Sequence, residues 1–308
     1  INFLFTDSGC PNADGDLAMI WIMDRINISS SCNNENINLN SKATTTNVID
    51  IGGLFGDFGF YSASKGCKTV IFEPQKRFAS YIAESAKLNP SFSSLVDVRN
   101  EAVSKEKELL LLAPQKPQRG TGGNENPGTT QIKTLKRPYT GSNLRGSANG
   151  NGNSSSSSSF DNDNNSIIKG VQLDNVFKND DNILLLKIDT EGMEGSIIDT
   201  AYNLLNKHKI KHLIFEYTPY QFRNRGTSYA IILNYLYNIH HVTSCYALHR
   251  RKAKIYKILH KDYDEFYSSM YLMKFQTDIY CNFLSIKDDE KLFNSDDVEI
   301  WVSSGKKK

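Results

Sequence analysis

The chain has 308 residues, 39% of them hydrophobic and 23% charged, so it holds enough apolar side chains for a sizeable core and is not a disordered protein. Its 36 basic and 34 acidic residues leave a net charge of +2, which excludes the strongly basic surface of a typical nucleic-acid-binding protein. No apolar run approaches the roughly 20 residues needed to span a bilayer, and we therefore expect a globular protein without a membrane span.

The first part of the chain consists of an extension and the start of a regular α/β pattern. Residues 1–46 are predicted to form an N-terminal extension that is partly flexible, because 32–46 is rich in asparagine. Strands and helices then alternate. The expected elements are a strand at 47–51, a helix at 58–65, a strand at 69–72, a helix at 78–86 and a strand at 95–98.

A long polar insertion follows a further possible strand at 108–112. From residue 114 to 166 the chain is rich in Gly, Ser, Asn, Pro and Thr, with an unbroken run of serines at 154–159. Such a segment cannot bury enough apolar surface to offset the entropy lost on ordering. We therefore predict a disordered insertion between two parts of one fold.

The alternation resumes after the insertion and completes a domain predicted to run from residue 47 to 290, with a C-terminal tail at 291–308. The expected elements are a strand at 183–188, a helical stripe at 197–205, a strand at 212–215, a helix at 229–237 and weaker strands near 242–246 and 280–286. Strands alternating with helices indicate a mostly parallel central sheet with helices on both faces. Ligands of such sheets bind beyond the carboxyl ends of the strands.

The first candidate site is the glycine-rich segment after the strand at 47–51. Its pattern does not fit the G-x-G-x-x-G dinucleotide fingerprint; Asp50, Gly52 and Gly56 instead fit the D-x-G-x-x-x-G loop of S-adenosylmethionine-dependent methyltransferases. An acidic residue at this strand tip suits a ligand that carries an ammonium and a sulfonium and would repel a phosphate. An ordinary glycine-rich turn between strand and helix is the alternative.

Two further candidates follow the next two strands. Glu73 lies 23 residues after Asp50, where an acidic residue at the second strand tip binds a ribose diol; a solvated glutamate before a proline is the alternative. Asn100 and Glu101 follow the third strand, where a polar side chain can bond to an adenine edge. A surface turn explains each of these two residues equally well.

The fourth candidate lies after the most apolar strand. Four charged residues occur at the end of a strand whose other residues are apolar and predicted to be buried: Lys187, Asp189, Glu191 and Glu194. Removing charges from water costs several kcal/mol each unless they are paired or used, so this is a functional-site candidate. Alternatively, Asp189 caps the following helix. A divalent metal on Asp189 and Glu191 lacks a third nearby ligand, and no metal site is predicted.

Taken together, four segments resemble the FkbM-type methyltransferases. They are VIDIGGLFGDFGFY at 48–61, VIFEP at 70–74, LKIDTEGME at 186–194 and IFE at 214–216. The Leu-Asp pair at 173–174 also looks like the helix start that precedes the family's motif strand. The resemblance extends over residues 47–246, apart from the insertion. Gly53 departs from the pattern, since the family usually has alanine there.

This resemblance implies a class I methyltransferase fold, which is Rossmann-like, with S-adenosyl-L-methionine as cofactor and O-methylation of a hydroxyl on a small molecule or sugar. The family roles would then be distributed as follows: Asp50, Gly52, Gly53 and Gly56 hold the methionine end, Glu73 the ribose, and Asn100 or Glu101 the adenine, while Asp189 and Glu191 face the methyl group. The proton of the acceptor hydroxyl would pass to Asp189 or Glu191, and Lys187 would tune this pair.

Two other functions stay open. A nicotinamide-dependent oxidoreductase is disfavoured by the glycine spacing and by the lack of a Tyr-x-x-x-Lys-type motif for hydride transfer. A catalytically silent module of the same fold, kept for binding, is disfavoured by the intact set of Asp50, Glu73, Asp189 and Glu191.

The five cysteines are scattered, with no Cys-x-x-Cys pair, so we expect free thiols and a cytoplasmic location. Glycosylation sequons begin at Asn27, Asn153 and Asn164. In a chain so rich in Asn and Ser they are expected by accident, and they argue only weakly for secretion.

Overall fold

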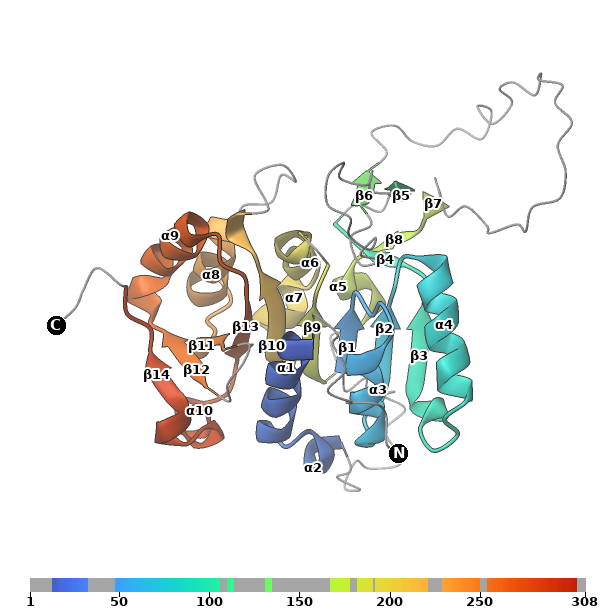
Figure 1. Cartoon of the computed structure of the whole chain (residues 1–308), viewed down its shortest axis with the longest axis horizontal. Helices are drawn as coiled ribbons and strands as arrows, with labels where there is room; N and C mark the ends of the chain where they lie inside the picture. The colour runs from blue at the N-terminus through green and yellow to red at the C-terminus, as the bar shows by residue number, and fades with distance from the viewer. Residues whose placement is uncertain are drawn as a thin grey trace, which may run out of the picture.

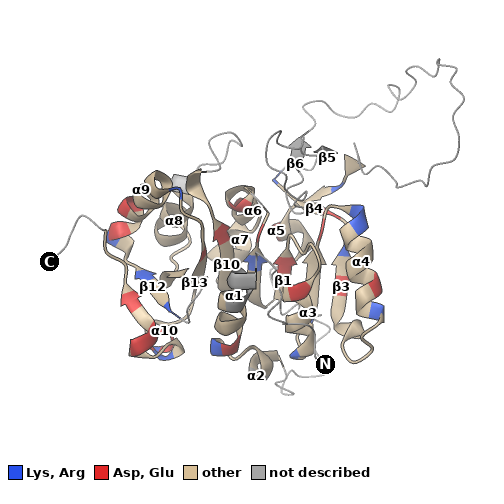
Figure 2. Cartoon of the chain, viewed as in Figure 1, with Lys and Arg blue, Asp and Glu red and all other residues tan. Residues whose placement is uncertain are grey.

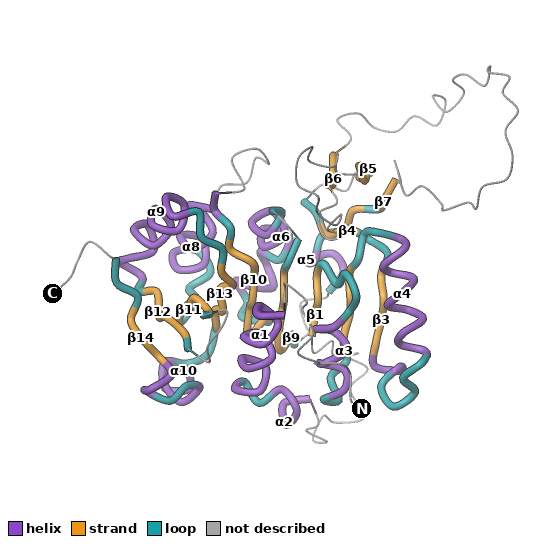
Figure 3. The backbone as a smooth tube through the Cα atoms, viewed as in Figure 1, coloured by secondary structure: helices purple, strands orange, loops and turns teal. Residues whose placement is uncertain are grey.

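The structure is a computed structural model that describes residues 13–32, 48–105, 110–113, 131–134, 167–177, 182–190, 192–220, 229–249 and 254–303. At its centre lies a nine-stranded sheet with helices on both faces (Figures 1 and 3). Its strand order is β14-β12-β11-β13-β10-β9-β1-β2-β3. This arrangement confirms the predicted α/β class.

Five neighbouring strands form the parallel part of the sheet. They are β3 (Val96–Arg99), β2 (Thr69–Phe72), β1 (Val48–Ile51), β9 (Ile183–Ile188) and β10 (Ile210–Tyr217). All residues of β1, β2 and β9 are buried. Strands covered on both faces have little need of polar residues, which explains the near-continuous apolar runs in the sequence.

The other four strands extend the sheet beyond β10. Antiparallel β13 (Thr277–Asn282) lies between β10 and β11 (Ser244–Leu248), followed by β12 (Ile255–Ile258) and β14 (Val298–Ile300). The boundary predicted at residue 290 remains a prediction, but β14 pairs with β12 and Trp301 packs against the core. Of the residues expected as a tail, 298–300 therefore continue the sheet.

The helices divide between the two faces. One face packs against α1 (Ala13–Arg25), α2 (Ile28–Cys32) and α3 (Asp57–Ser64), and the other against α5 (Leu173–Val176), α6 (Glu194–Thr200), α7 (Tyr202–Asn206), α8 (Tyr229–Asn238) and α9 (Tyr263–Met273). In addition, α4 (Lys76–Lys87) contacts β3, and α10 (Ile286–Leu292) precedes β14. The N-terminal helices α1 and α2, expected in a partly flexible extension, contribute buried residues to the core. None of the described helices is long and apolar enough to cross a bilayer.

Short strands flank the predicted insertion at the upper edge in Figure 1. Parallel β4 (Ala102–Val103) and β8 (Gly170–Val171) form one pair. A second small sheet joins β5 (Leu110–Ala113) to β6 (Gln131–Thr134) and β7 (Ile167–Ile168). Because β6 lies inside the segment expected to be disordered throughout, that expectation is too broad. The rest of the insertion, 114–130 and 135–166, lies outside the described residues.

Two disulfides contradict the expectation of free thiols. Cys32 in α2 is bonded to Cys67, and Cys245 in β11 is bonded to its cross-strand partner Cys281 in β13. The partners lie 35 and 36 residues apart in sequence, and only the strand order brings them together. Cys10 lies outside the described residues. The cytoplasmic location expected from free thiols thereby loses its basis.

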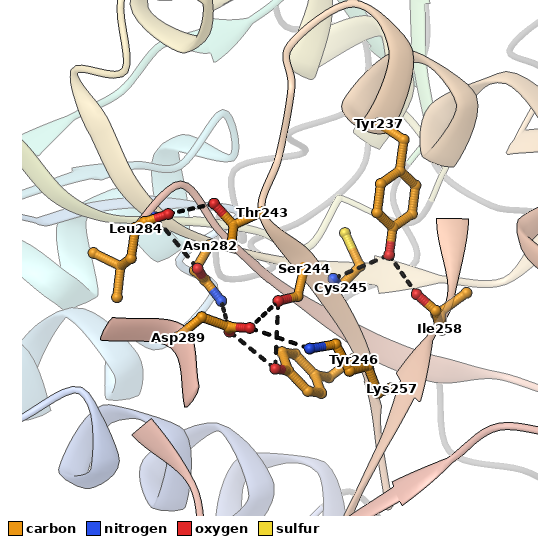
Figure 4. A network of polar contacts seen from close by, with 10 residues as sticks. All are labelled: Tyr237, Thr243, Ser244, Cys245, Tyr246, Lys257, Ile258, Asn282, Leu284 and Asp289. Carbon is orange, nitrogen blue, oxygen red and sulfur yellow. Dashed lines mark hydrogen bonds and ion pairs between the residues drawn. The ribbon is translucent and has the colours of Figure 1, made fainter. Parts of the chain in front are cut away.

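A buried polar network fastens α10 to the antiparallel strands (Figure 4). The Asp289 carboxylate accepts hydrogen bonds from Ser244, Tyr246 and Asn282 and pairs with Lys257. Burial alone would raise the pKa of Asp289, but these donors outweigh it and hold the pKa below its ordinary value. The carboxylate is fully engaged, so we assign it a structural role.

Candidate functional site

The glycine loop packs directly against the end of β9. Gly52 has φ of 80°, and a Cβ there would lie 1.8 Å from the backbone oxygen of Asp189. The Gly52 N–H donates to Phe72 O at 3.0 Å, which also ties the loop to β2. Only glycine combines this backbone conformation with so close an approach. At the loop's end, Gly56, with φ of 82°, caps α3.

Asp50 and Lys187 lie beneath the loop. Both side chains are buried, and the Lys187 Nζ lies 3.2 Å from Asp50 Oδ1 and donates to Gly52 O at 3.2 Å. The other Asp50 oxygen accepts a hydrogen bond from the Gly59 N–H of α3 at 3.1 Å. Asp50 is thus held by partners that fix the loop and the helix from below. A buried ion pair with these extra hydrogen bonds meets the condition for tolerating desolvation.

Glu73 lies beside the same loop at the end of β2. Its side chain is only 3% exposed, and its oxygens accept hydrogen bonds from Leu54 N at 2.9 Å and Gln75 N at 2.8 Å. Burial raises the pKa of Glu73 above its ordinary value, although these two backbone donors act against the shift. Each carboxylate oxygen has two lone pairs, so a second donor can still be accepted at each.

Asn100 and Glu101 border the site on its other side. The Asn100 amide donates to Glu73 O at 3.0 Å and to Pro74 O at 2.9 Å, so it fixes the backbone that carries Glu73. Glu101 lines a cavity and accepts a hydrogen bond from Lys169 Nζ at 2.7 Å.

That cavity lies between the ends of β1 and β2, the segment after β3 and the start of α6. Its walls include Gly52, Phe72, Ala102, Met193 and Ile197. An aromatic ring and aliphatic side chains in one lining suit a flat, largely apolar group with polar atoms on its edge. An adenine has this chemistry. The residues at this edge therefore fit S-adenosylmethionine by their chemistry: an apolar lining beside Ala102, the carboxylate of Glu73, and a loop in which Gly52 offers backbone alone.

The end of β9 presents the predicted reactive residues. The Asp189 N–H donates to Ile51 O at 3.0 Å, and its side chain is 39% exposed with Oδ2 at 3.8 Å from Lys187 Nζ. Asp189 is thus the more solvent-accessible of the two carboxylates that flank Lys187. Glu191, predicted beside it, lies outside the described residues.

Glu194 holds the loop after β9 from inside. It is fully buried and accepts hydrogen bonds from the Thr190 N–H at 2.9 Å, the Thr190 hydroxyl at 3.1 Å and the Gly192 N–H at 3.1 Å. Burial raises its pKa to about 7. The sequence placed Glu194 in the motif without a role. Its position at the first residue of α6, two residues after Gly192, was the available signal.

Two buried carboxylates that sequence reasoning did not assign continue this edge. Ile188 pairs with Phe215, so Asp189 and Glu216 follow at the same edge of the sheet, and Glu216 pairs in turn with Asp278 of β13. Glu216 and Asp278 are almost completely buried. Figure 2 shows acidic segments near the upper ends of β1 and β10. Asp278 was missed because the antiparallel position of β13 cannot be read from its sequence.

The structure thus gathers most of the predicted residues at one edge of the sheet. The predicted residues grouped there are Asp50, Gly52, Gly53, Gly56, Glu73, Lys187 and Asp189, with Asn100 and Glu101 beside them. Among the residues that the structure describes, no group of three or more His, Cys, Asp or Glu side chains could hold a metal ion.

Comparison with solved structures finds two kinds of similar protein. The chain is similar to the methyltransferase FkbM from Methylobacillus flagellatus KT, with 14% identity and a TM-score of 0.42 over 82% of this chain and 47% of that one. It is also similar to WbdD, described as a bifunctional kinase-methyltransferase, with 15% identity and a TM-score of 0.30 over 68% of this chain and 32% of that one. The chain therefore spans about half the length of the first protein and a third of the second.

A search of curated proteins finds no match to the chain. A family model described as the methyltransferase FkbM domain matches residues 50–246, which is more than half of the chain. The match begins at Asp50, ends in β11 and includes the glycine loop, Glu73 and the end of β9. The chain belongs to the FkbM methyltransferase family.

Proposed function

We propose that this protein uses S-adenosyl-L-methionine to methylate a hydroxyl oxygen on a small molecule or sugar. The observation that carries the proposal is the position of Glu73, a buried carboxylate held by Leu54 N and Gln75 N beside a loop that leaves no room for a Cβ at Gly52. A ribose diol donates two hydrogen bonds, which matches the two oxygens of such a carboxylate.

The remaining parts of the cofactor site follow from the same geometry. The backbone of Gly52, Gly53 and Gly56 receives the methionine end, and the cavity beside Ala102 receives the adenine. Asp50 acts through the loop it supports, since its carboxylate is already engaged by Lys187 and by the Gly59 N–H. When bound, the cofactor supplies a methyl group that the positive sulfonium has activated.

The chain's own residues then align the acceptor and take its proton. Asp189 is the base that we assign, because its carboxylate is partly exposed at the strand end, while Lys187 at 3.8 Å balances its charge. Glu191 keeps its predicted place as the other candidate base. Most of the rate gain in such a displacement comes from holding the oxygen and the methyl group in line.

Glu216 and Asp278 continue the edge that begins at Asp189, but both are almost completely buried. Asp189 is therefore the carboxylate of this edge that an acceptor hydroxyl can reach.

Calorimetry tests the cofactor assignment on the full chain. We expect binding of S-adenosylmethionine and S-adenosylhomocysteine, and at least a tenfold loss of affinity in Glu73→Gln, which corresponds to about 1.4 kcal/mol. Glu84→Gln is the matched control, because Glu84 is exposed on α4 and pairs with Lys87. Binding of NAD alone would show an oxidoreductase instead and would overturn the proposal.

Turnover separates an enzyme from a silent module of the same fold. A library of hydroxyl compounds and sugars is screened for transfer of an isotopically labelled methyl group. We expect Asp189→Asn to lower turnover by about 10²- to 10⁴-fold, the range for loss of a general base, with cofactor affinity retained. Cofactor binding without transfer to any acceptor would favour the silent module.

A further inference from the structure

We propose that Asn27 carries an N-linked oligosaccharide, attached in the oxidising compartment in which the two disulfides form. In the sequence alone, this sequon is expected by chance. The fold adds two observations: the sequon is exposed, and the chain contains two disulfides. This glycosylation does not depend on the proposed methyl transfer.

The sequon at Asn27 occupies an exposed turn. Asn27 lies between α1 and α2 with φ of 52°, and its side chain is exposed, as is that of Ser29. The flanking Ile26 and Ile28 are buried in the core. The two isoleucines therefore anchor the turn while Asn27 and Ser29 face outward, as an Asn-x-Ser acceptor requires in a folded glycoprotein.

The disulfides specify the compartment. Cys32 lies five residues after Asn27 and is bonded to Cys67, and the second disulfide joins Cys245 to Cys281. Disulfides form and persist in secreted proteins and in the lumen of the secretory pathway, and they are rare where thiols are kept reduced. Asparagine sequons are glycosylated in the same lumen. Disulfide formation and N-glycosylation thus indicate the same compartment, the lumen of the secretory pathway.

The transfer balances without any other group on this chain. The side-chain amide nitrogen of Asn27 forms a bond to the anomeric carbon of a lipid-diphosphate-linked oligosaccharide. The bond from that carbon to the diphosphate oxygen breaks, the lipid diphosphate leaves with the electron pair, and the amide loses one proton. Each disulfide forms as two thiols pass two electrons and two protons to a disulfide-bearing oxidoreductase.

An oligosaccharide at Asn27 leaves the cofactor site open. Cys67, to which α2 is bonded, comes just before β2 begins at Thr69, so α2 lies at the amino ends of the parallel strands. The glycine loop lies at their carboxyl ends. Figure 1 shows α2 at the lower edge and the short strands around the insertion at the upper edge.

One tryptic peptide reports on both modifications. Cleavage after Arg25 and Lys42 releases residues 26–42, which contain Cys32 and a single sequon, that of Asn27. The protein is isolated from its native cells after free thiols have been blocked with N-ethylmaleimide. An amidase that removes N-linked glycans in ¹⁸O water marks each glycosylated asparagine as labelled aspartate. We expect the label at position 27, and a disulfide between this peptide and residues 66–68.

Two variants separate glycosylation from a purely structural role of Asn27. Ser29→Ala destroys the sequon and keeps the asparagine in its positive-φ turn, whereas Ser29→Thr keeps the sequon. We expect the oligosaccharide to be absent in the first and present in the second, with unchanged affinity for S-adenosylhomocysteine in both. Unlabelled Asn27 as the main form, or N-ethylmaleimide on Cys32, Cys67, Cys245 or Cys281, would overturn the proposal.

Discussion

Single residues of the glycine loop differ in what they tolerate, although Gly52 and Gly53 are neighbours. A Cβ at Gly52 would meet a backbone oxygen at 1.8 Å, and φ is positive there; a Cβ at Gly53 would meet the Ile71 Cγ2 methyl at 2.4 Å and the Ile82 Cδ1 methyl at 3.3 Å. The side chains of Ile71 and Ile82 can shift to make room, whereas the backbone of Asp189 at the end of β9 cannot. The alanine usual at position 53 in this family thus requires only a different packing of Ile71.

We therefore predict that Gly52→Ala abolishes binding of S-adenosylhomocysteine and lowers the melting temperature more than Gly53→Ala does. Gly53→Ala should retain binding and cost about 1–3 kcal/mol, the usual range for overpacking a core. Calorimetry and thermal unfolding of the two variants check this. Equal losses in both variants would show that the backbone contact at Gly52 has no special effect.

At Glu194 the structure predicts a pH dependence of stability. Its carboxyl has a pKa of about 7 in the folded chain, raised by burial from the ordinary 4.5. Between these values the folded state binds the proton and the unfolded state releases it, so Glu194 stabilises the fold less and less as the pH rises from 4.5 to 7. The full effect is about 3 kcal/mol.

Glu194→Gln should remove this dependence, and unfolding in denaturant at several pH values measures it. The comparison with the unsubstituted chain is essential, because His212 contributes with the opposite sign. Burial lowers the pKa of His212 to about 3, so its contribution to stability is lost as the pH falls below 6.5. Parallel curves for the two proteins would contradict the assignment to Glu194.

At the scale of elements, the two disulfides close loops of nearly equal length but hold different structures. Cys245 and Cys281 join strands that the sheet already pairs, whereas Cys32 and Cys67 fasten the short helix α2 to the residues before β2. Loop entropy alone gives about 4 kcal/mol for each, so both contribute similarly to global stability in that model.

Replacing each pair by alanine should accordingly lower the melting temperature by similar amounts, while local protection differs. We expect hydrogen exchange in α2 to accelerate in Cys32→Ala/Cys67→Ala and that in β11 to stay slow in Cys245→Ala/Cys281→Ala. Exchange measured by mass spectrometry checks this. Unchanged protection of α2 without its disulfide would show that packing of Ile28 alone holds the helix.

The elements that sequence reasoning identified are those with local signals. The strands at 69–72 and 183–188 have the predicted boundaries, because both are apolar runs closed by polar residues. Among the elements missed are β12, β14 and α9, whose apolar residues are interrupted by polar ones: Lys257 in β12, Glu299 in β14, and an Asp-Glu pair in the first turn of α9. The disulfides and the Asp278 position depend on the order of strands, which no local pattern contains.

In the site, too, the features with a local sequence signal were predicted and those that depend on tertiary structure were not. Glu73 and Asp189 lie at the ends of strands that sequence identified, so their convergence followed from parallel pairing. The engagement of Asp50 by the Gly59 N–H and the role of Asn100 as a support for Glu73 depend on side-chain conformations that spacing does not specify.

For the molecule as a whole, the insertion provides a test of what the fold needs. A chain in which residues 135–164 are replaced by a short Gly-Ser linker keeps β6, whereas deletion of 118–164 removes it. We predict that the first variant unfolds within about 2 °C of the full chain and binds S-adenosylhomocysteine equally well, because loop length changes the closure entropy only slowly.

Deletion of 118–164 removes β6, so β5 loses one of its two partner strands and keeps β7. Its additional loss of stability, measured by thermal unfolding, therefore gives the contribution of that strand pair. A large drop in melting temperature already in the first variant would show that residues 135–164 are part of the folded core.

The bond from Lys187 to Gly52 O spans 135 positions of the chain, and it crosses the pairing of β1 with β9. The described parts of the chain before and after the insertion meet along that pair of central strands, along the short pairs β4–β8 and β5–β7, and where α1 packs against the later strands. A break in the backbone within the insertion would leave both β1 and β9 intact. We therefore expect the two parts of the chain, produced as separate polypeptides, to assemble into one folded protein. Only the assembled protein would contain both the glycine loop and Lys187.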